Sequence, residues 1–208
     1  MKILELFSGT ESFSKVAKAR GHKCFTIDNH KKFKPDLWMD ILKLDISMIP
    51  FKPDIIWASP PCTEYSHAKR KGVRKIEEAN KIVLKTLEII KQLNPKMWII
   101  ENPQTGLLKN QEFMKGLPFT DCSYCKYGMP YRKQTRFWNN FNLKLRICKR
   151  DCDFMDGNKH ISSAGNGRRI WHTKGKFLEQ EDKYPVPKEL CLEIIKECEK
   201  LTALRRKK

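Results

Sequence analysis

The sequence predicts an α/β fold in which helices cover both faces of a largely parallel sheet. Through the first half of the chain, short apolar segments of strand length alternate with a polar turn and then a segment of helical periodicity. Gly, Pro and Asn separate these segments, as expected for turns. A chain of 208 residues is also long enough to bury a substantial core, as one domain or one domain with a small appendage.

The N-terminal residues predict a strand, a glycine turn and a helix. Residues 2–7 form the apolar strand, Gly9 lies in the turn, and the helix runs from about residue 13 to residue 20. A second strand at 23–28 ends in Asp28. This order offers backbone N–H groups to a nucleotide-like ligand and a carboxylate to its ribose. Because a dinucleotide fingerprint has three glycines and this turn has one, these residues alone leave a cofactor site undecided.

The central strand leads into a rigid turn that carries a cysteine. A third short strand is expected at about 37–41, with Asp40 near its end, and residues 54–58 form a buried strand followed by Ser-Pro-Pro-Cys62. Two prolines fix the loop, so Cys62 is held just beyond a strand end, where parallel sheets place their chemistry. The alternative is an inert buried thiol.

The remaining elements extend the sheet and then change its character. A helix is expected at 76–93 and a strand at 97–100, with Glu101 at the strand end. Strand-like pieces at 119–124 and 135–138 predict an antiparallel end to the sheet, and the last helix is expected at 188–204. Residues 64–74 are strongly basic and predict a loop that covers the sheet edge.

Residues 139–183 predict an irregular basic insertion. The spacing of the cysteines is compatible with a tetrahedral zinc site that pins it, and the alternative is ordinary thiols. The four preferred ligands are Cys125, Cys148, Cys152 and His160.

The formal charge of +18 favours a polyanionic partner, with nucleic acid as the first expectation. No apolar run is long enough to span a bilayer, and the N-terminus begins directly with a strand, so we expect no membrane association and an intracellular, soluble protein of the cytoplasm or the nucleus or nucleoid. In a reducing compartment the eight cysteines are better candidates for thiols and metal ligands than for disulfides.

Four short motifs occur in order: Glu5-Leu-Phe-Ser-Gly9, Ser59-Pro-Pro-Cys62, Glu101-Asn-Pro103 and Gln134-Thr-Arg136. Together they resemble the cytosine-C5 DNA methyltransferases, and the chain looks like a small member that lacks a large target-recognition domain. The resemblance implies a Rossmann-like class I methyltransferase sheet. It places an S-adenosylmethionine-dependent domain at 1–138 and 184–208. Residues 139–183 fall outside that domain, and the zinc site that the cysteine spacing allows would make them a small module that reads nucleic acid.

The resemblance also implies the roles of the catalytic residues. Cys62 adds to C6 of cytosine, Glu101 serves the ring nitrogen N3, and Arg136, with Gln134 in the same motif, holds the base at O2. The implied cofactor residues are Phe7, Ser8, Gly9, Thr10, Asp28, Asn29, Asp40, Ile41 and Pro60. The implied nucleic-acid residues are Ser66, Lys69, Arg70, Lys71, Arg74, Arg168 and Arg169.

The chain departs from the family pattern at three of its motifs, and no Gly-Asn dipeptide directly precedes Pro185. Glu11 and Ser12 stand where the family has glycines, Pro103 replaces a valine, and Trp138 replaces a final arginine. Two other functions therefore stay open beside DNA methylation. One is cytosine-C5 methylation of RNA such as tRNA, and the other is a non-catalytic nucleic-acid-binding or regulatory protein on a methyltransferase scaffold.

Overall fold

The computed structural model describes the whole chain except residues 70, 163–184 and 207–208. Its centre is a seven-stranded sheet with the order β3-β2-β1-β4-β5-β7-β6. The strands from β3 to β5 in this order pair in parallel, whereas β7 is antiparallel to both of its neighbours. The strands are β1 (Lys2–Leu6), β2 (Lys23–Asp28), β3 (Leu37–Trp38), β4 (Ile55–Ala58), β5 (Met97–Pro103), β6 (Phe119–Ser123) and β7 (Gln134–Asn139). The predicted parallel sheet with an antiparallel end is confirmed.

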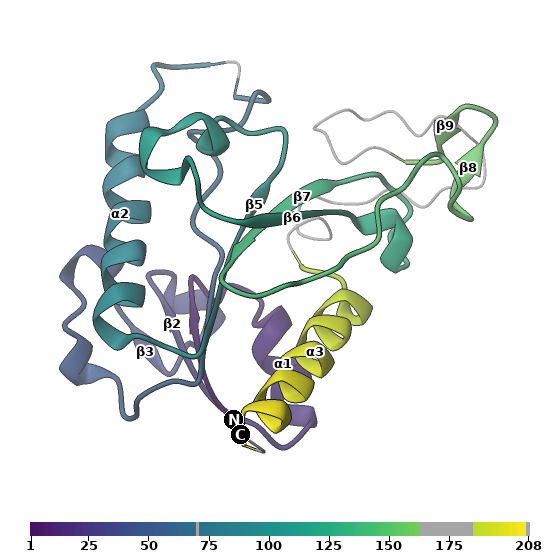
Figure 1. Cartoon of the computed structure of the whole chain (residues 1–208). Coiled ribbons are helices and arrows are strands. Elements are labelled where there is room, and N and C mark those ends of the chain that lie inside the picture. The colour runs from purple at the N-terminus through teal and green to yellow at the C-terminus, as the bar shows by residue number, and fades with distance from the viewer. Residues whose placement is uncertain (70, 163–184, 207–208) are drawn as a thin grey trace.

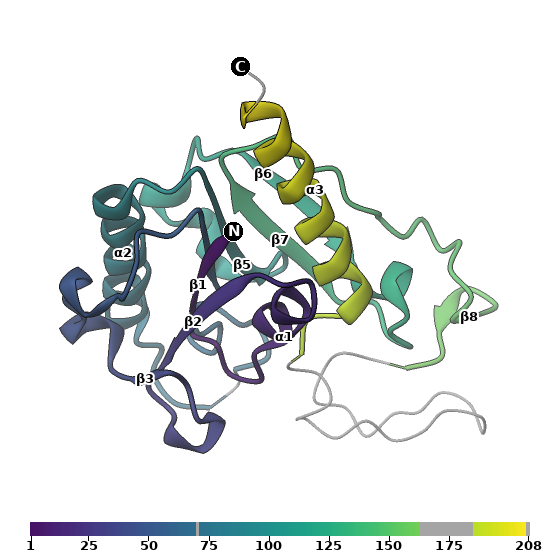
Figure 2. The same ribbon diagram turned by 90° about the horizontal axis from the view of Figure 1, so that it is seen from below.

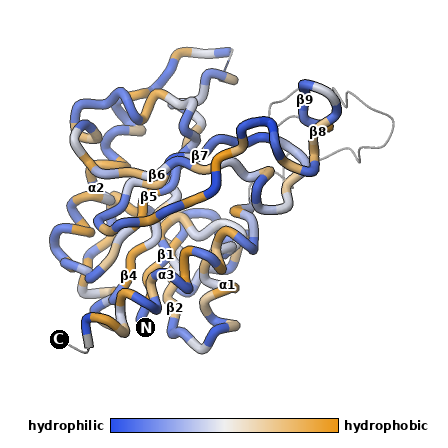
Figure 3. Tube along the Cα trace, turned by 45° about the vertical axis from the view of Figure 1, so that its right-hand side comes forward, coloured by the Kyte–Doolittle hydropathy of each residue, from blue (hydrophilic) through white to orange (hydrophobic). Residues whose placement is uncertain are grey.

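Helices cover both faces of this sheet, as predicted (Figures 1 and 2). Helices α1 (Ser12–Ala19) and α3 (Lys188–Arg206) pack on one face, where Phe13 of α1 and Ile194 of α3 join a buried cluster. Helix α2 (Ile76–Leu93) packs on the other face through side chains such as Val83. Figure 3 shows hydrophobic segments in the central strands and a mixture of hydrophobic and hydrophilic residues along the helices, as two buried interfaces require.

Short 3-10 turns complete the connections. They are η1 (Lys31–Phe33), η2 (Ile41–Lys43), η3 (Ile46–Met48), η4 (Leu107–Asn110), η5 (Glu112–Met114) and η6 (Tyr124–Tyr127). The third strand is shorter than the predicted 37–41, because the carboxylate of Asp40 accepts the backbone N–H of Leu42 at 3.0 Å. This cap starts η2 and turns the chain away from the sheet.

The described part of the predicted insertion runs along the outer edge of the sheet. The hydroxyl of Thr120 in β6 donates to the carbonyl of Leu143 at 2.7 Å, and the backbone N–H of Cys148 donates to the hydroxyl of Ser123 at 3.1 Å. Beyond this contact, β8 (Met155–Asp156) and β9 (Lys159–His160) form a small antiparallel hairpin. Arg168 and Arg169 lie outside the described residues, and the division at 139–183 stays a prediction.

Within the described ranges, none of the helices combines the length and the hydrophobicity that crossing a bilayer requires.

Candidate active site

The turn between β1 and α1 has the shape of a ligand-binding loop. Phe7 and Gly9 both adopt positive φ, at 58° and 44°. The carboxylate of Asp28 accepts the backbone N–H of Gly9 at 2.8 Å and that of His30 at 2.7 Å. Asp28 at the end of β2 therefore fixes two loops at the carboxyl edge of the sheet.

The departure at Glu11 has a structural explanation. Glu11 adopts φ 55°, a left-handed conformation that glycine adopts readily and a side chain does not. This explains why the family prefers a glycine at this position. The Glu11 carboxylate pairs with Lys18 at 3.3 Å and is absent from the walls of the cavities described below, so the chain keeps the backbone shape without filling the site.

Two cavities lie over this edge of the sheet, and Phe7 and Pro61 line both. The larger has a volume of about 600 Å³ and contains the glycine turn. The smaller, of about 30 Å³, contains the carboxylates of Asp28 and Asp40. All nine predicted cofactor residues line one cavity or the other: Ser8, Gly9, Thr10 and Pro60 the larger, Asp28, Asn29, Asp40 and Ile41 the smaller, and Phe7 both.

These walls fit a nucleoside-containing cofactor. Acceptors for ribose hydroxyls and an adenine amino group lie beside an aromatic ring, and the glycine turn faces the larger volume. S-adenosylmethionine has a size and polarity suited to this pair of cavities.

Cys62 and Glu101 line the larger cavity together. Cys62 follows β4, and Glu101 lies in β5 one residue beyond Ile100, where the parallel pairing with β4 ends, so both reach the same edge of the sheet. The side-chain amide of Asn102 donates to the carbonyl of Pro60 at 2.9 Å, which ties the Glu-Asn-Pro segment to the turn that carries the thiol. The hydroxyl of Tyr124 donates to the Glu101 carboxylate at 3.2 Å and orients it.

The groups around Cys62 shift the pKa of its thiol in opposite directions. Burial raises the pKa of the Cys62 thiol, and the negative charge of Glu101 raises it further. The ammonium group of Lys133 acts in the opposite direction on this pKa. Lys133 lines the same cavity and lies over the ring of Tyr124, with its Nζ 4.8 Å from the ring centroid.

Gln134 and Arg136 are not among the residues that line the cavity. In the β5–β7 ladder Glu101 pairs with Phe137 and Asn102 with Arg136, so Glu101 and Arg136 point to opposite faces of the sheet. Both Nε and Nη2 of Arg136 donate to the carboxylate of Asp121 at 2.8 Å, and the guanidinium stacks on Phe119. The cation that the structure brings to Cys62 is Lys133, one residue before the predicted motif.

Glu5 is a second residue of the site that the sequence analysis did not single out, although it begins the first motif. Its side chain is 3% exposed, lines the larger cavity and accepts the backbone N–H of Ser14 at 2.8 Å. Burial raises its pKa to about 7. A single carboxylate inside an apolar strand that is buried on both faces was the signal that could have found it.

The basic loop after Cys62 is held by its own polar residues. Lys69 pairs with the carboxylate of Glu64 at 2.6 Å. The Arg74 guanidinium donates to the carbonyls of Glu64 at 2.9 Å and Ser66 at 2.7 Å. Lys71 is exposed, whereas Arg70 lies outside the described residues. The role of these residues in binding nucleic acid stays a prediction.

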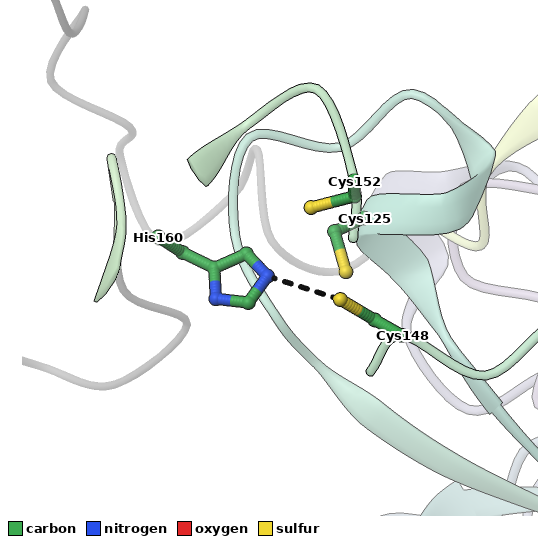
Figure 4. Close-up of side chains that lie close together, drawn as sticks. All are labelled: Cys125, Cys148, Cys152 and His160. Carbon is green, nitrogen blue, oxygen red and sulfur yellow. Dashed lines mark hydrogen bonds between the residues drawn. The ribbon is translucent and has the colours of Figure 1, made fainter. Parts of the chain in front are cut away.

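The predicted metal ligands converge as expected. Figure 4 shows the side chains of Cys125, Cys148, Cys152 and His160 pointing toward one another, and their ligand atoms all lie within 4.8 Å of one another. They come from η6, from the two sides of the turn at 148–152 and from β9.

A mixed sheet with this strand order, a glycine turn over its carboxyl edge and a thiol beside it define a methyltransferase fold. A solved methyltransferase of Entamoeba histolytica, EhMeth, shares this fold with a TM-score of 0.52 and 18% identity, over 71% of this chain and 56% of that one. The S. pombe Dnmt2 methyltransferase matches with a TM-score of 0.49 and 17% identity, over 69% of this chain and 53% of that one. This chain therefore spans little more than half the length of those structures.

Sequence comparison identifies the family. Residues 1–115 match the C-5 cytosine-specific DNA methylase family. A "Probable DNA (cytosine-5)-methyltransferase" of Frog virus 3 (isolate Goorha) is 32% identical over 95% of this chain and 100% of that protein. The chain belongs to the C-5 cytosine-specific DNA methylase family, as its motifs predicted.

Proposed function

We propose that this protein transfers a methyl group from S-adenosylmethionine to C5 of cytosine in DNA through a covalent bond to Cys62. The observation that carries the proposal is the larger cavity, in which the thiol of Cys62, the carboxylate of Glu101 and the glycine turn face one volume. Family membership supports the reaction class.

The chemistry assigns a separate task to each side chain. Cytosine C5 is a poor nucleophile, so the Cys62 sulfur adds to C6 and the ring electrons move toward C5. Glu101, oriented by Tyr124, hydrogen-bonds at N3 while the ring accepts those electrons. S-adenosylmethionine would supply the methyl group that C5 takes, with the neutral thioether as the leaving group. A water molecule then takes the C5 proton, the bond between C6 and the Cys62 sulfur breaks to return the thiolate, and the aromatic ring is restored.

Lys133 is the cation that we assign to the developing negative charge in this cavity. Lys133 favours the thiolate form of Cys62. It suits the stabilisation of this charge better than Arg136, whose own charge is paired with Asp121. The base-holding role predicted for Arg136 requires Arg136 to leave that pair.

DNA is the proposed substrate because of the family and the charge. A formal charge of +18 favours binding to phosphate, and Lys32 and Lys133 bring positive charge to the cavity itself. A cytosine stacked in a duplex cannot reach Cys62, so the base must be flipped out or already unpaired. We also propose a reducing, intracellular location, because the motif assigns Cys62 a reactive thiol and three further cysteines suit metal ligands.

The test uses an oligonucleotide in which 5-fluorocytosine replaces cytosine, because fluorine at C5 blocks the final loss of the proton. With S-adenosylmethionine present, mass spectrometry should find a stable adduct whose peptide maps to Cys62. Cys62→Ser should give no adduct. Cys24→Ser, which removes a thiol outside the cavity, should form it as the parent does.

The substrate is decided by parallel reactions with DNA and with tRNA of matched cytosine content. An adduct only with tRNA would move the proposal to RNA. If the folded protein binds S-adenosylmethionine in a titration but forms no adduct with either nucleic acid, the enzymatic proposal is wrong.

A further inference from the structure

The cluster of Cys125, Cys148, Cys152 and His160 lies outside the cavity and has no task in the proposed reaction. Three thiols and one imidazole are a ligand set that zinc prefers. Zn–S bonds of about 2.3 Å and Zn–N bonds of about 2.0–2.1 Å in a tetrahedron place sulfur and nitrogen about 3.5 Å apart. The Sγ of Cys148 and Nε2 of His160 are 3.5 Å apart.

The backbone around the cluster is shaped to hold a thiolate. Arg150 adopts φ 68°, a strained left-handed conformation that tightens the turn between Cys148 and Cys152. This turn aims the backbone N–H of Arg150 at the Cys148 sulfur, at 3.3 Å. An N–H donated to a ligand sulfur is the kind of outer contact that orients metal ligands. Cys125 and Cys148 are 3% and 1% exposed, so the cluster is closed on that side as structural sites are.

We propose that these four residues bind one structural Zn²⁺, which fixes the insertion to the turn that supports the catalytic carboxylate. The residue before Cys125 is Tyr124, whose hydroxyl donates to Glu101 and whose backbone N–H donates to the carbonyl of Lys133 at 3.1 Å. The turn η6 therefore carries a metal ligand on one side and contacts to Glu101 and Lys133 on the other.

The metal takes the place of a hydrophobic core in the described segment 149–162. Between residues 149 and 162 no described side chain is fully buried, and β8 and β9 each have only two residues. So small a hairpin is unstable alone, and one metal ion can supply the missing free energy.

The experiment measures metal in the full-length protein, purified with a reductant and without chelators. We expect about one zinc per chain, released when an organomercurial titrates the thiols. Cys148→Ser and His160→Asn should each reduce the bound zinc to a small fraction of that value. Cys24→Ser, which removes an equally free thiol elsewhere, should retain it.

Hydrogen exchange then tests the coupling. Removing zinc should increase exchange in residues 124–127 and 148–160 while exchange in β1 and β4 stays the same. Folded protein that contains no zinc and gives no thiolate charge-transfer absorption with Co²⁺ would overturn the site, as would a disulfide within the cluster. Zinc bound without any change in exchange at 124–127 on its removal would overturn the coupling. Neither result depends on methyl transfer, so this proposal can fail while the proposed function stands.

Discussion

The two sides of the larger cavity are built by different kinds of strand. On one side the walls come from the carboxyl ends of β1, β2, β4 and β5, which pair in parallel, and from the turns beyond them. On the other side they come from the region of β7, which is antiparallel to β5. Every catalytic or cofactor residue predicted on the parallel side lines a cavity, whereas Gln134 and Arg136 on the antiparallel side do not.

The difference lies in what a strand end determines. All carboxyl ends of parallel strands reach one edge, so a residue just past a strand arrives there whichever face it prefers. A residue inside an antiparallel strand points to one face or the other, and the register decides which. The motif around Arg136 predicts which strand carries this residue but not the face of the sheet to which its side chain points. In this structure the Arg136 guanidinium lies on the face opposite to the Glu101 side chain.

The largest effect is expected on the parallel side, at Glu5. Its pKa of about 7 in the folded chain exceeds the ordinary value of 4.5, so burial favours the protonated form. The stability that this gives is present below pH 4.5 and is lost as the pH rises through about 7. Relative to Glu5→Gln, the parent should lose roughly 3 kcal/mol in free energy of unfolding between pH 4 and pH 8.

Urea unfolding of both proteins across that pH range checks this prediction. Glu112→Gln, which changes an exposed glutamate, serves as the matched control and should follow the parent curve. If the free energy of unfolding of the parent and of Glu5→Gln changed with pH in the same way, Glu5 would be ionised and hydrated in the folded protein. Burial would then keep no carboxylate neutral on the side of the cavity built by parallel strands.

On the antiparallel side, a pair of variants separates Lys133 from Arg136. Lys133→Met removes the positive charge that lowers the pKa of Cys62, so this pKa should rise and alkylation of the thiol near neutral pH should slow. Methyl transfer should fall by about tenfold or more, as for loss of one group that stabilises developing charge. The checks are the pH profile of iodoacetamide labelling at Cys62 and kcat/KM for DNA.

Arg136→Met is the matched control for this charge. It should leave the labelling profile unchanged and lower the free energy of unfolding by about 1–2 kcal/mol, since Asp121 loses its partner. A loss of methyl transfer in Arg136→Met at unchanged stability would restore the predicted role of Arg136, and the contrast between the two sides would disappear.

Much of this architecture could be predicted because the decisive signals are local. Residues 76–93 carried a full helical stripe, and α2 has those bounds. The Ser-Pro-Pro-Cys62 turn is fixed by its prolines and by the strand before it. The convergence of Cys125, Cys148, Cys152 and His160 was predictable because metal ligands are sparse and must meet if they act together.

The features that were missed depend on particular contacts that the pattern of apolar and polar residues does not show. Lys133 becomes part of the site only because η6 and β7 bring it over Tyr124, and its immediate neighbours Arg132 and Gln134 are basic and polar. The third strand ended early because one side chain, Asp40, competed for a backbone N–H. In the first case a tertiary contact placed the residue in the site, and in the second a side-chain cap ended the strand. The pattern of apolar and polar residues predicts neither.

The smallest predicted effect concerns the glycine turn, where the chain keeps the family's backbone with a glutamate. Since Glu11 adopts φ 55°, Glu11→Gly removes left-handed strain and loses only an exposed pair with Lys18. Its free energy of unfolding should be unchanged or higher by up to about 1 kcal/mol. Lys15→Gly, at an exposed position inside α1, should lower it by about 1 kcal/mol. Denaturant titrations of the two variants should therefore differ in sign or nearly so. Equal losses would mean that Glu11 stabilises the turn through its side chain, and that the departure from glycine is an adaptation of this chain's cofactor loop and not a tolerated strain.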